Sequence, residues 1–153
     1  MSVRIVLDAS ALLGYAKVDT ALAVGEIIRE VREEGGNAQV AVPVSALLTA
    51  YTAVDETGRG LLASIVADVE LARLRNDPHQ SVFVVLPLTS VDLTQVADFE
   101  SSWPGRGQAI LEALRHDAIL ATFEPCQHAS ARLDIVDLGL GWTDDSGWEI
   151  STE

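Results

Sequence analysis

The sequence predicts an α/β domain, a three-layer sandwich with a central, mainly parallel sheet. Short β-branched apolar runs alternate with helical segments along the chain, which is typical of strands joined by helical crossovers. The 153 residues suit one domain, and hydrophobic residues make up 48% of them, enough for one core. Residues 1–153 are therefore expected to form a single domain without a linker or an internal repeat.

The N-terminal segment predicts a strand that leads directly into a helix. Residues 3–7 (VRIVL) form an apolar run that ends at Asp8, and the Ala- and Leu-rich residues after it are expected to be helical. Apolar residues spaced by three and four predict a second helix over 20–34, which Gly35 and Gly36 end.

The next segment repeats this order. Residues 39–42 (QVAV) predict a strand, and Ser45 is the expected N-cap of the helix that follows. Gly58 and Gly60 are expected to end that helix, because glycine is a poor helix former. The next helix is then expected over 61–75.

Residues 81–86 (SVFVVL) predict the third strand, because they are almost entirely apolar and rich in valine. A short helix is expected over 92–99, capped by Thr89 or Ser90.

The rest of the chain predicts one long helix and a weak strand. Residues 103–107 are expected to form a loop, and 108–123 contain the longest uninterrupted helical pattern, ended or kinked by Pro125. Residues 133–136 are a candidate strand, and 138–153 are expected to form an edge strand or a tail.

The charge limits the partners. Ten Lys and Arg against 23 Asp and Glu give a formal net charge of -13. So few cations cannot form the broad basic patch that many phosphate contacts require, so no DNA partner and no membrane partner is predicted. A single cysteine, Cys126, excludes an internal disulfide and fits a reducing compartment, so a cytoplasmic location is expected.

Three acids are candidate metal ligands. Asp8 follows the first expected strand, Asp137 follows the last, and Asp117 lies within the long helical pattern. Carboxylates from distant segments that meet at one sheet edge can hold a hard cation such as Mg²⁺, which offsets their repulsion and can activate water for hydrolysis. Each acid taken alone equally suits a turn or a helix cap.

Three segments resemble the PIN-domain family. VLDASALLGYAK (6–17) resembles the family's opening strand, its Asp-x-Ser and its Ala/Leu-rich helix. VPVSALLTAY (42–51) resembles the second strand and helix, and HDAILAT (116–122) resembles the family's Asp-Ala-x-x-Ala stretch. The resemblance covers most of the chain to about Asp137. It implies a PIN-like fold, Mg²⁺ or Mn²⁺ held by acids, and cleavage of single-stranded RNA, often as the toxin of a toxin–antitoxin pair.

The resemblance also assigns roles to residues. Asp8, Asp117 and Asp137 match the acids that bind the metal and act in catalysis, and Ser10 matches the small polar residue beside the first acid. Asp134 competes with Asp137 for the fourth acidic position, where the family more often shows Thr-x-Asp.

One position departs from the family pattern. Neutral Thr49 stands where the family usually has its second acid, so the cluster is short of one carboxylate and is expected to bind Mg²⁺ or Mn²⁺ weakly. Arg106 and Arg115 are the candidate substrate-binding residues.

Two functions remain open. The first is a PIN-like binding or regulatory module with reduced or no nuclease activity. The alternative is a Mg/Mn-dependent single-stranded RNA endoribonuclease of the toxin–antitoxin type. The resemblance implies three partners: single-stranded RNA, an antitoxin-like protein, and a second copy of the chain in a homodimer.

Overall fold

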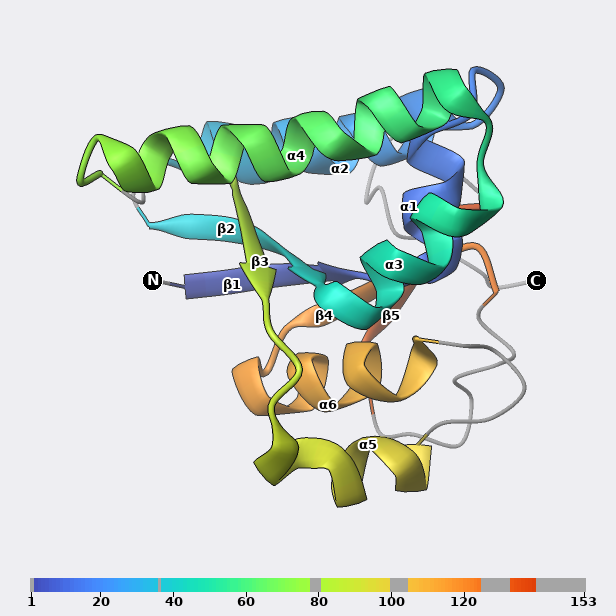
Figure 1. Ribbon diagram of the computed structural model, residues 1–153, viewed down its shortest axis with the longest axis vertical. Coiled ribbons are helices and arrows are strands. Elements are labelled where there is room, and N and C mark those ends of the chain that lie inside the picture. Colours follow the sequence, from blue (N-terminus) through green and yellow to red (C-terminus); the bar gives the residue numbers. More distant parts are fainter. Residues whose placement is uncertain (1, 36, 78–80, 100–104, 125–132, 140–153) are drawn as a thin grey trace.

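A five-stranded sheet, parallel throughout, forms the centre of the molecule (Figure 1). The computed structural model describes residues 2–35, 37–77, 81–99, 105–124 and 133–139. The strands are β1 (Ser2–Leu7), β2 (Ala38–Pro43), β3 (Phe83–Leu86), β4 (Ile119–Thr122) and β5 (Ile135–Asp137). Their order is β3-β2-β1-β4-β5, so β1 lies in the middle, and the carboxyl ends of all five strands meet at one edge.

Helices cover both faces of this sheet, so the predicted three-layer α/β class is confirmed. Figure 1 shows α2 and α4 on one face, α5 and α6 on the other, and α1 and α3 near the carboxyl ends of the strands. The helices are α1 (Ala9–Tyr15), α2 (Ala21–Glu34), α3 (Val44–Ala53), α4 (Glu56–Leu74), α5 (Leu93–Phe99) and α6 (Arg106–His116), with a short 3-10 turn, η2 (Ser90–Asp92).

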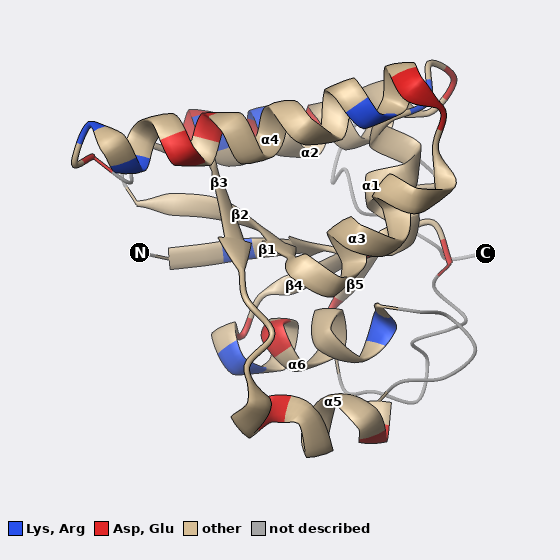
Figure 2. Ribbon diagram, in the orientation of Figure 1, with Lys and Arg blue, Asp and Glu red and all other residues tan. Residues whose placement is uncertain are grey.

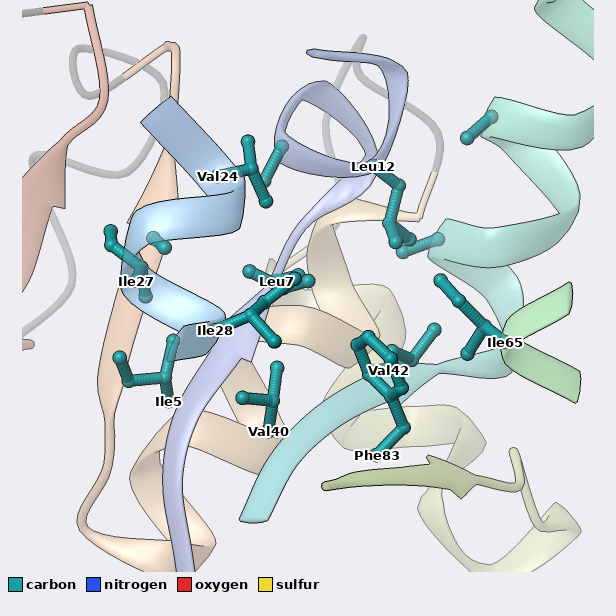
Figure 3. Packing of buried hydrophobic residues seen from close by; sticks show 14 of the residues in the cluster. Ile5, Leu7, Leu12, Val24, Ile27, Ile28, Val40, Val42, Ile65 and Phe83 are labelled. Atoms are coloured by element: carbon teal, nitrogen blue, oxygen red, sulfur yellow. The ribbon is translucent and has the colours of Figure 1, made fainter. Parts of the chain in front are cut away.

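The sheet separates two apolar clusters, because successive side chains of a strand point to opposite faces. The larger cluster lies under α2 and α4, and Figure 3 shows it. Its labelled members include Ile5, Leu7, Val40, Val42 and Phe83 from the strands and Val24, Ile27, Ile28 and Ile65 from the two helices. The smaller cluster packs Val6, Ala41 and Leu120 of the sheet against Ala109 and Ala113 of α6.

The prediction of a helix over 108–123 is wrong for the second half of that segment. Helix α6 ends at His116, Asp117 caps it in the left-handed conformation (φ 53°, ψ 46°), and β4 follows. Leu120 and Ala121 are fully buried in β4, which pairs with β1 on one side and β5 on the other. Burial and strand pairing therefore outweigh the helix preference of this alanine-rich segment.

The helix expected over 61–75 begins earlier, at Glu56, and continues through both Gly58 and Gly60. Asp55 caps it, because its Oδ1 accepts a hydrogen bond from the Gly58 N–H at 2.8 Å. This cap offsets part of the cost of about 1 kcal/mol that each glycine imposes on a helix.

Some expectations lie outside the described residues, namely those for 103–104, for Cys126 and for the tail beyond residue 139. Within the described part of the chain, no helix has both the length and the apolar character needed to cross a membrane.

Candidate functional site at the carboxyl edge of the sheet

Asp8 stands where β1 ends and α1 begins, at the carboxyl edge of the sheet. Its Oδ1 accepts hydrogen bonds from the Ala11 N–H at 2.9 Å and from the Ser10 hydroxyl at 2.8 Å. Only 4% of Asp8 is exposed. The same carboxylate that marks the candidate site is therefore the N-cap that begins helix α1.

Ser10 connects this cap to the end of β4. Its Oγ lies 3.0 Å from the Thr122 Oγ1 and accepts a hydrogen bond from the Phe123 N–H at 2.9 Å. Because the single Ser10 proton goes to Asp8, the Thr122 hydroxyl must donate to Ser10. Thr122 Oγ1 in turn accepts from the Glu124 N–H at 2.9 Å. The hydrogen bonds thus run in one direction, toward Asp8, and the hydroxyl of Ser10 is saturated.

Asp137 ends β5 at the same edge. It pairs with Thr122, and Leu7 pairs with Ala121, so the ends of β1, β4 and β5 lie level. Two strand spacings separate the backbones of β1 and β5, which is about 10 Å. The Asp137 Oδ1 accepts a hydrogen bond from the Gly139 N–H at 2.9 Å. Asp134 instead precedes β5, toward the opposite edge, so Asp137 is the acid that this strand presents at the site.

The structure does not bring Asp117 to Asp8. Asp117 lies between α6 and β4, at the amino edge of the sheet, and is exposed. Asp8 follows Leu7, the partner of Ala121, so about five residues of strand, or roughly 16 Å, separate the levels of the two acids. A single Mg²⁺ with ligands at about 2.0–2.1 Å cannot bridge that distance. The helix that was expected to hold Asp117 ends one residue before it, and this sends the acid to the wrong edge.

Uncharged side chains occupy the part of the edge near β2. Thr49 lies in α3, and its hydroxyl donates to the Ser45 carbonyl of the same helix at 3.0 Å. Gln108, which the sequence gave no reason to select, is 1% exposed. Its Oε1 accepts from the backbone N–H and the hydroxyl of Ser45, at 2.8 and 2.6 Å, and its Nε2 donates to the Leu86 carbonyl at 3.0 Å. This amide therefore joins α6, α3 and the end of β3.

The two candidate substrate-binding residues lie at opposite ends of α6. Arg106 begins the helix at the carboxyl edge, where Gly105 before it (φ 87°) approaches Ala46 so closely that a Cβ would meet the Ala46 Cα at 2.9 Å. Arg115 lies in the last turn, and its Nη2 pairs with the Asp92 Oδ1 at 2.8 Å. Hydrogen bonding from Arg115 lowers the pKa of Asp92, and the same interaction raises the pKa of Arg115. Arg115 is thus engaged in an ion pair away from Asp8.

Sequence reasoning missed Thr122 and Glu124. Thr122 is fully buried at the end of β4, and its hydroxyl links Ser10 to Glu124. The sequence does contain a pattern that points to them, the Thr-x-acid spacing of Thr122-Phe123-Glu124. It is similar to the Thr-x-Asp that the PIN-domain family usually shows at its fourth acidic position, which was matched to Asp137. It was hidden because residues 108–123 were expected to be helical throughout.

Helix α3, beside this edge, has an unusual surface. Its ten residues (VSALLTAYTA) include no charged side chain, and Figure 2 shows it entirely tan. Val44, Leu48 and Tyr51, spaced along one face, are 38, 64 and 39% exposed. A helix that is apolar on its outer face as well as its inner face is typical of an interface.

The described residues contain no group of three or more His, Cys, Asp and Glu side chains arranged to hold a metal ion. What the edge provides is a capping carboxylate, two linked hydroxyls, a buried amide and two further acids, Glu124 after β4 and Asp137 at the end of β5. In the described geometry these acids are not gathered around one point, as a Mg²⁺ or Mn²⁺ centre with several carboxylate oxygens requires. No protein-family model matches the chain, and no curated protein is similar enough to it to count as a relative.

Proposed function

We propose that the chain is a PIN-like domain with an incomplete metal-binding cluster, which acts in the cytoplasm as a binding or regulatory module with reduced or no nuclease activity. The observation that carries the proposal is the commitment of Asp8 to the fold. Its Oδ1 caps α1 and accepts the Ser10 proton, while Asp117 lies at the opposite edge and neutral Thr49 and Gln108 lie near β2.

A specific observation favours the alternative, a Mg/Mn-dependent single-stranded RNA endoribonuclease with an antitoxin-like partner. Asp8, Glu124 and Asp137 follow or end three adjacent strands at one edge. Carboxylate oxygens are the ligands that Mg²⁺ and Mn²⁺ prefer, so movement of these three side chains toward one another would supply the donors that the described geometry lacks.

One experiment separates the two functions. The purified chain is incubated with labelled single-stranded RNA and Mn²⁺ or Mg²⁺, beside Asp8→Asn, Asp137→Asn and Asp117→Asn, and its melting temperature is measured with and without metal. A binding module gives no cleavage and no metal-induced rise in melting temperature. Cleavage that is lost in Asp8→Asn and Asp137→Asn but retained in Asp117→Asn would overturn the proposal and support the nuclease.

We further propose that the chain forms a homodimer through the exposed face of α3. Two copies that each carry a net charge of -13 repel each other. The exposed face of α3 contains no acid, and the Arg59 guanidinium lies 5.2 Å from the Tyr51 ring, so this face allows contact with the least repulsion. Burial of Leu48, which is 64% exposed, would add apolar contact. Sedimentation should show a dimer for the parent chain, a monomer for Leu48→Glu, and a dimer for the control Leu22→Glu, since Leu22 is 73% exposed on α2. A monomeric parent chain would contradict this interface.

A further inference from the structure

A groove with an apolar floor opens on the α2 side of the sheet, toward the amino edge and away from Asp8. Its volume is about 480 Å³, within the range of pockets that bind small molecules or side chains. Ile5 of β1, Val31 of α2 and Ile119 of β4 line its floor; Ile5 and Val31 are only 5 and 3% exposed, whereas Ile119 is half-buried. Its polar lining consists of Arg4 and the three carboxylates of Glu30, Glu33 and Glu34. The groove therefore combines apolar contact with an excess of negative charge.

A β-bulge shapes one wall. The pairing of β1 with β2 shifts between Val3 and Ile5, so Arg4 is the extra residue of the bulge. Bulges commonly redirect a side chain out of the regular alternation. The Arg4 Nε pairs with the Glu34 Oε2 at 2.9 Å, so this wall already holds one cation against one of the three carboxylates.

All three carboxylates lie in an unfavourable place. Glu30, Glu33 and Glu34 are in the last two turns of α2, where the negative end of the helix dipole opposes acids and favours cations. Glu30 also lies three residues before Glu33 and four before Glu34, so the three negative charges share one helix face. Arg29 pairs with Glu33 at 3.3 Å, but no ion pair of Glu30 is present among the described residues. A cation that entered the groove would relieve this repulsion.

We propose that this groove binds a basic, amphipathic peptide segment of a partner protein. An arginine or lysine would lie against Glu30, and an adjacent leucine-like side chain would pack on Ile119, beside Val31. A chain with a net charge of -13 attracts such a segment over long range, and the groove supplies the local complement. A second copy of this strongly acidic chain is a poor fit for an acidic groove, whereas the exposed face of α3, which contains no acid, suits one.

This inference names a partner class for the proposed binding function, but it rests on a surface at the other edge of the sheet from Asp8. Its failure would leave the interpretation of Asp8 untouched, because the nuclease and metal experiments do not involve the groove. Conversely, detection of nuclease activity would leave the groove and its peptide in place.

Fluorescence anisotropy with a labelled peptide of alternating leucine and arginine tests the proposal on the whole chain. Glu30→Gln should weaken binding about two- to fivefold, the range of an exposed ion pair. The matched control is Glu26→Gln, which removes the same charge from the same helix one turn earlier, outside the groove lining. It should bind like the parent chain, and circular dichroism verifies that both variants are folded.

Two further peptides define what would overturn the proposal. Replacing leucine with alanine in the peptide should weaken binding, and replacing arginine with glutamate should abolish it. Equal weakening by Glu30→Gln and Glu26→Gln, equal binding of the alanine peptide, or no binding at all would refute a specific groove. If the peptide binds only after a dimer of the parent chain dissociates, then a second copy of the chain occupies the groove in the dimer. That result would also refute the proposal.

Discussion

Replacing Asp8 with alanine removes an acceptor that two donors share. The Ala11 N–H loses its cap, and the buried Ser10 hydroxyl loses the partner that receives its proton. Loss of an N-cap costs about 0.5–2 kcal/mol. A buried hydroxyl left without an acceptor costs about 1–3 kcal/mol. The combined loss in the free energy of unfolding is therefore expected to be about 1.5–5 kcal/mol.

Asp8→Asn separates the structural role from the charge. Asparagine is as good an N-cap as aspartate, and its Oδ1 can accept from both donors, so both hydrogen bonds are kept while the interaction of the negative charge with the helix dipole is lost. That interaction is worth about 0.3–1 kcal/mol. The Asn variant should thus retain most of the stability that the Ala variant loses.

Guanidinium denaturation and thermal melting measure both variants. Since 1 kcal/mol shifts the melting temperature of a domain of this size by about 2–4 °C, Asp8→Ala should melt about 3–20 °C below the parent chain and Asp8→Asn within about 4 °C of it. Ser10→Ala is the partner control, because it removes the hydroxyl but leaves the cap to Ala11. An Asp8→Ala variant as stable as the parent, or an Asn variant as unstable as the Ala variant, would refute the capping role.

Three other changes test particular residues. Asp117→Gly should keep or raise stability, because glycine adopts the left-handed conformation (φ 53°) freely, whereas Asp117→Ala should cost about 1 kcal/mol; equal denaturation midpoints for the two variants would contradict this. Because Arg115 lowers the pKa of Asp92, the folded chain holds its Asp92 proton less tightly than the unfolded chain does, so the pair stabilises above about pH 4 and this stabilisation is lost as the pH falls further. Melting temperatures between about pH 2 and 6 should therefore depend less on pH in Asp92→Asn than in the parent chain, and parallel curves would argue against the pair. Gly14→Ala should lower the melting temperature, because the new Cβ would collide with the Phe123 ring, and an overpacked side chain typically costs about 1–3 kcal/mol; Gly25→Ala, which meets nothing within 4 Å, is the control.

The alternation of strands and helices was enough to predict the sheet class, because the strand residues at 3–7, 39–42 and 81–86 are apolar and β-branched. Strand β4 could not be predicted in the same way. Its sequence, ILAT, follows α6 without a glycine or proline, and only its pairing between β1 and β5 makes it a strand. The tertiary contacts that decide its state are absent from any local pattern.

The prediction of a helix in place of β4 explains why only part of the candidate site was predicted correctly. Asp8 could be placed because its strand and the helix after it are both evident in the sequence, and a carboxylate between them lies at the carboxyl edge. The PIN-domain resemblance of HDAILAT (116–122) groups Asp117 with Asp8, and the helix expected over 108–123 conceals which edge the acid faces. Gln108 gave no signal, because its three hydrogen bonds join elements that are far apart in the sequence.

The one-way series of hydrogen bonds from Glu124 to Asp8 has a consequence for hydrogen exchange. The amides of Phe123 and Glu124 lie just beyond β4, where a chain leaving a sheet normally exchanges with solvent quickly. Here each amide donates to a hydroxyl of the series, Phe123 to Ser10 and Glu124 to Thr122. The series ends at Asp8, the cap of α1, and it joins Ser10 to Thr122, which lies 112 residues away in the sequence. We therefore expect exchange of these two amides to be slow until α1 opens, so that the end of β4 and the start of α1 open together.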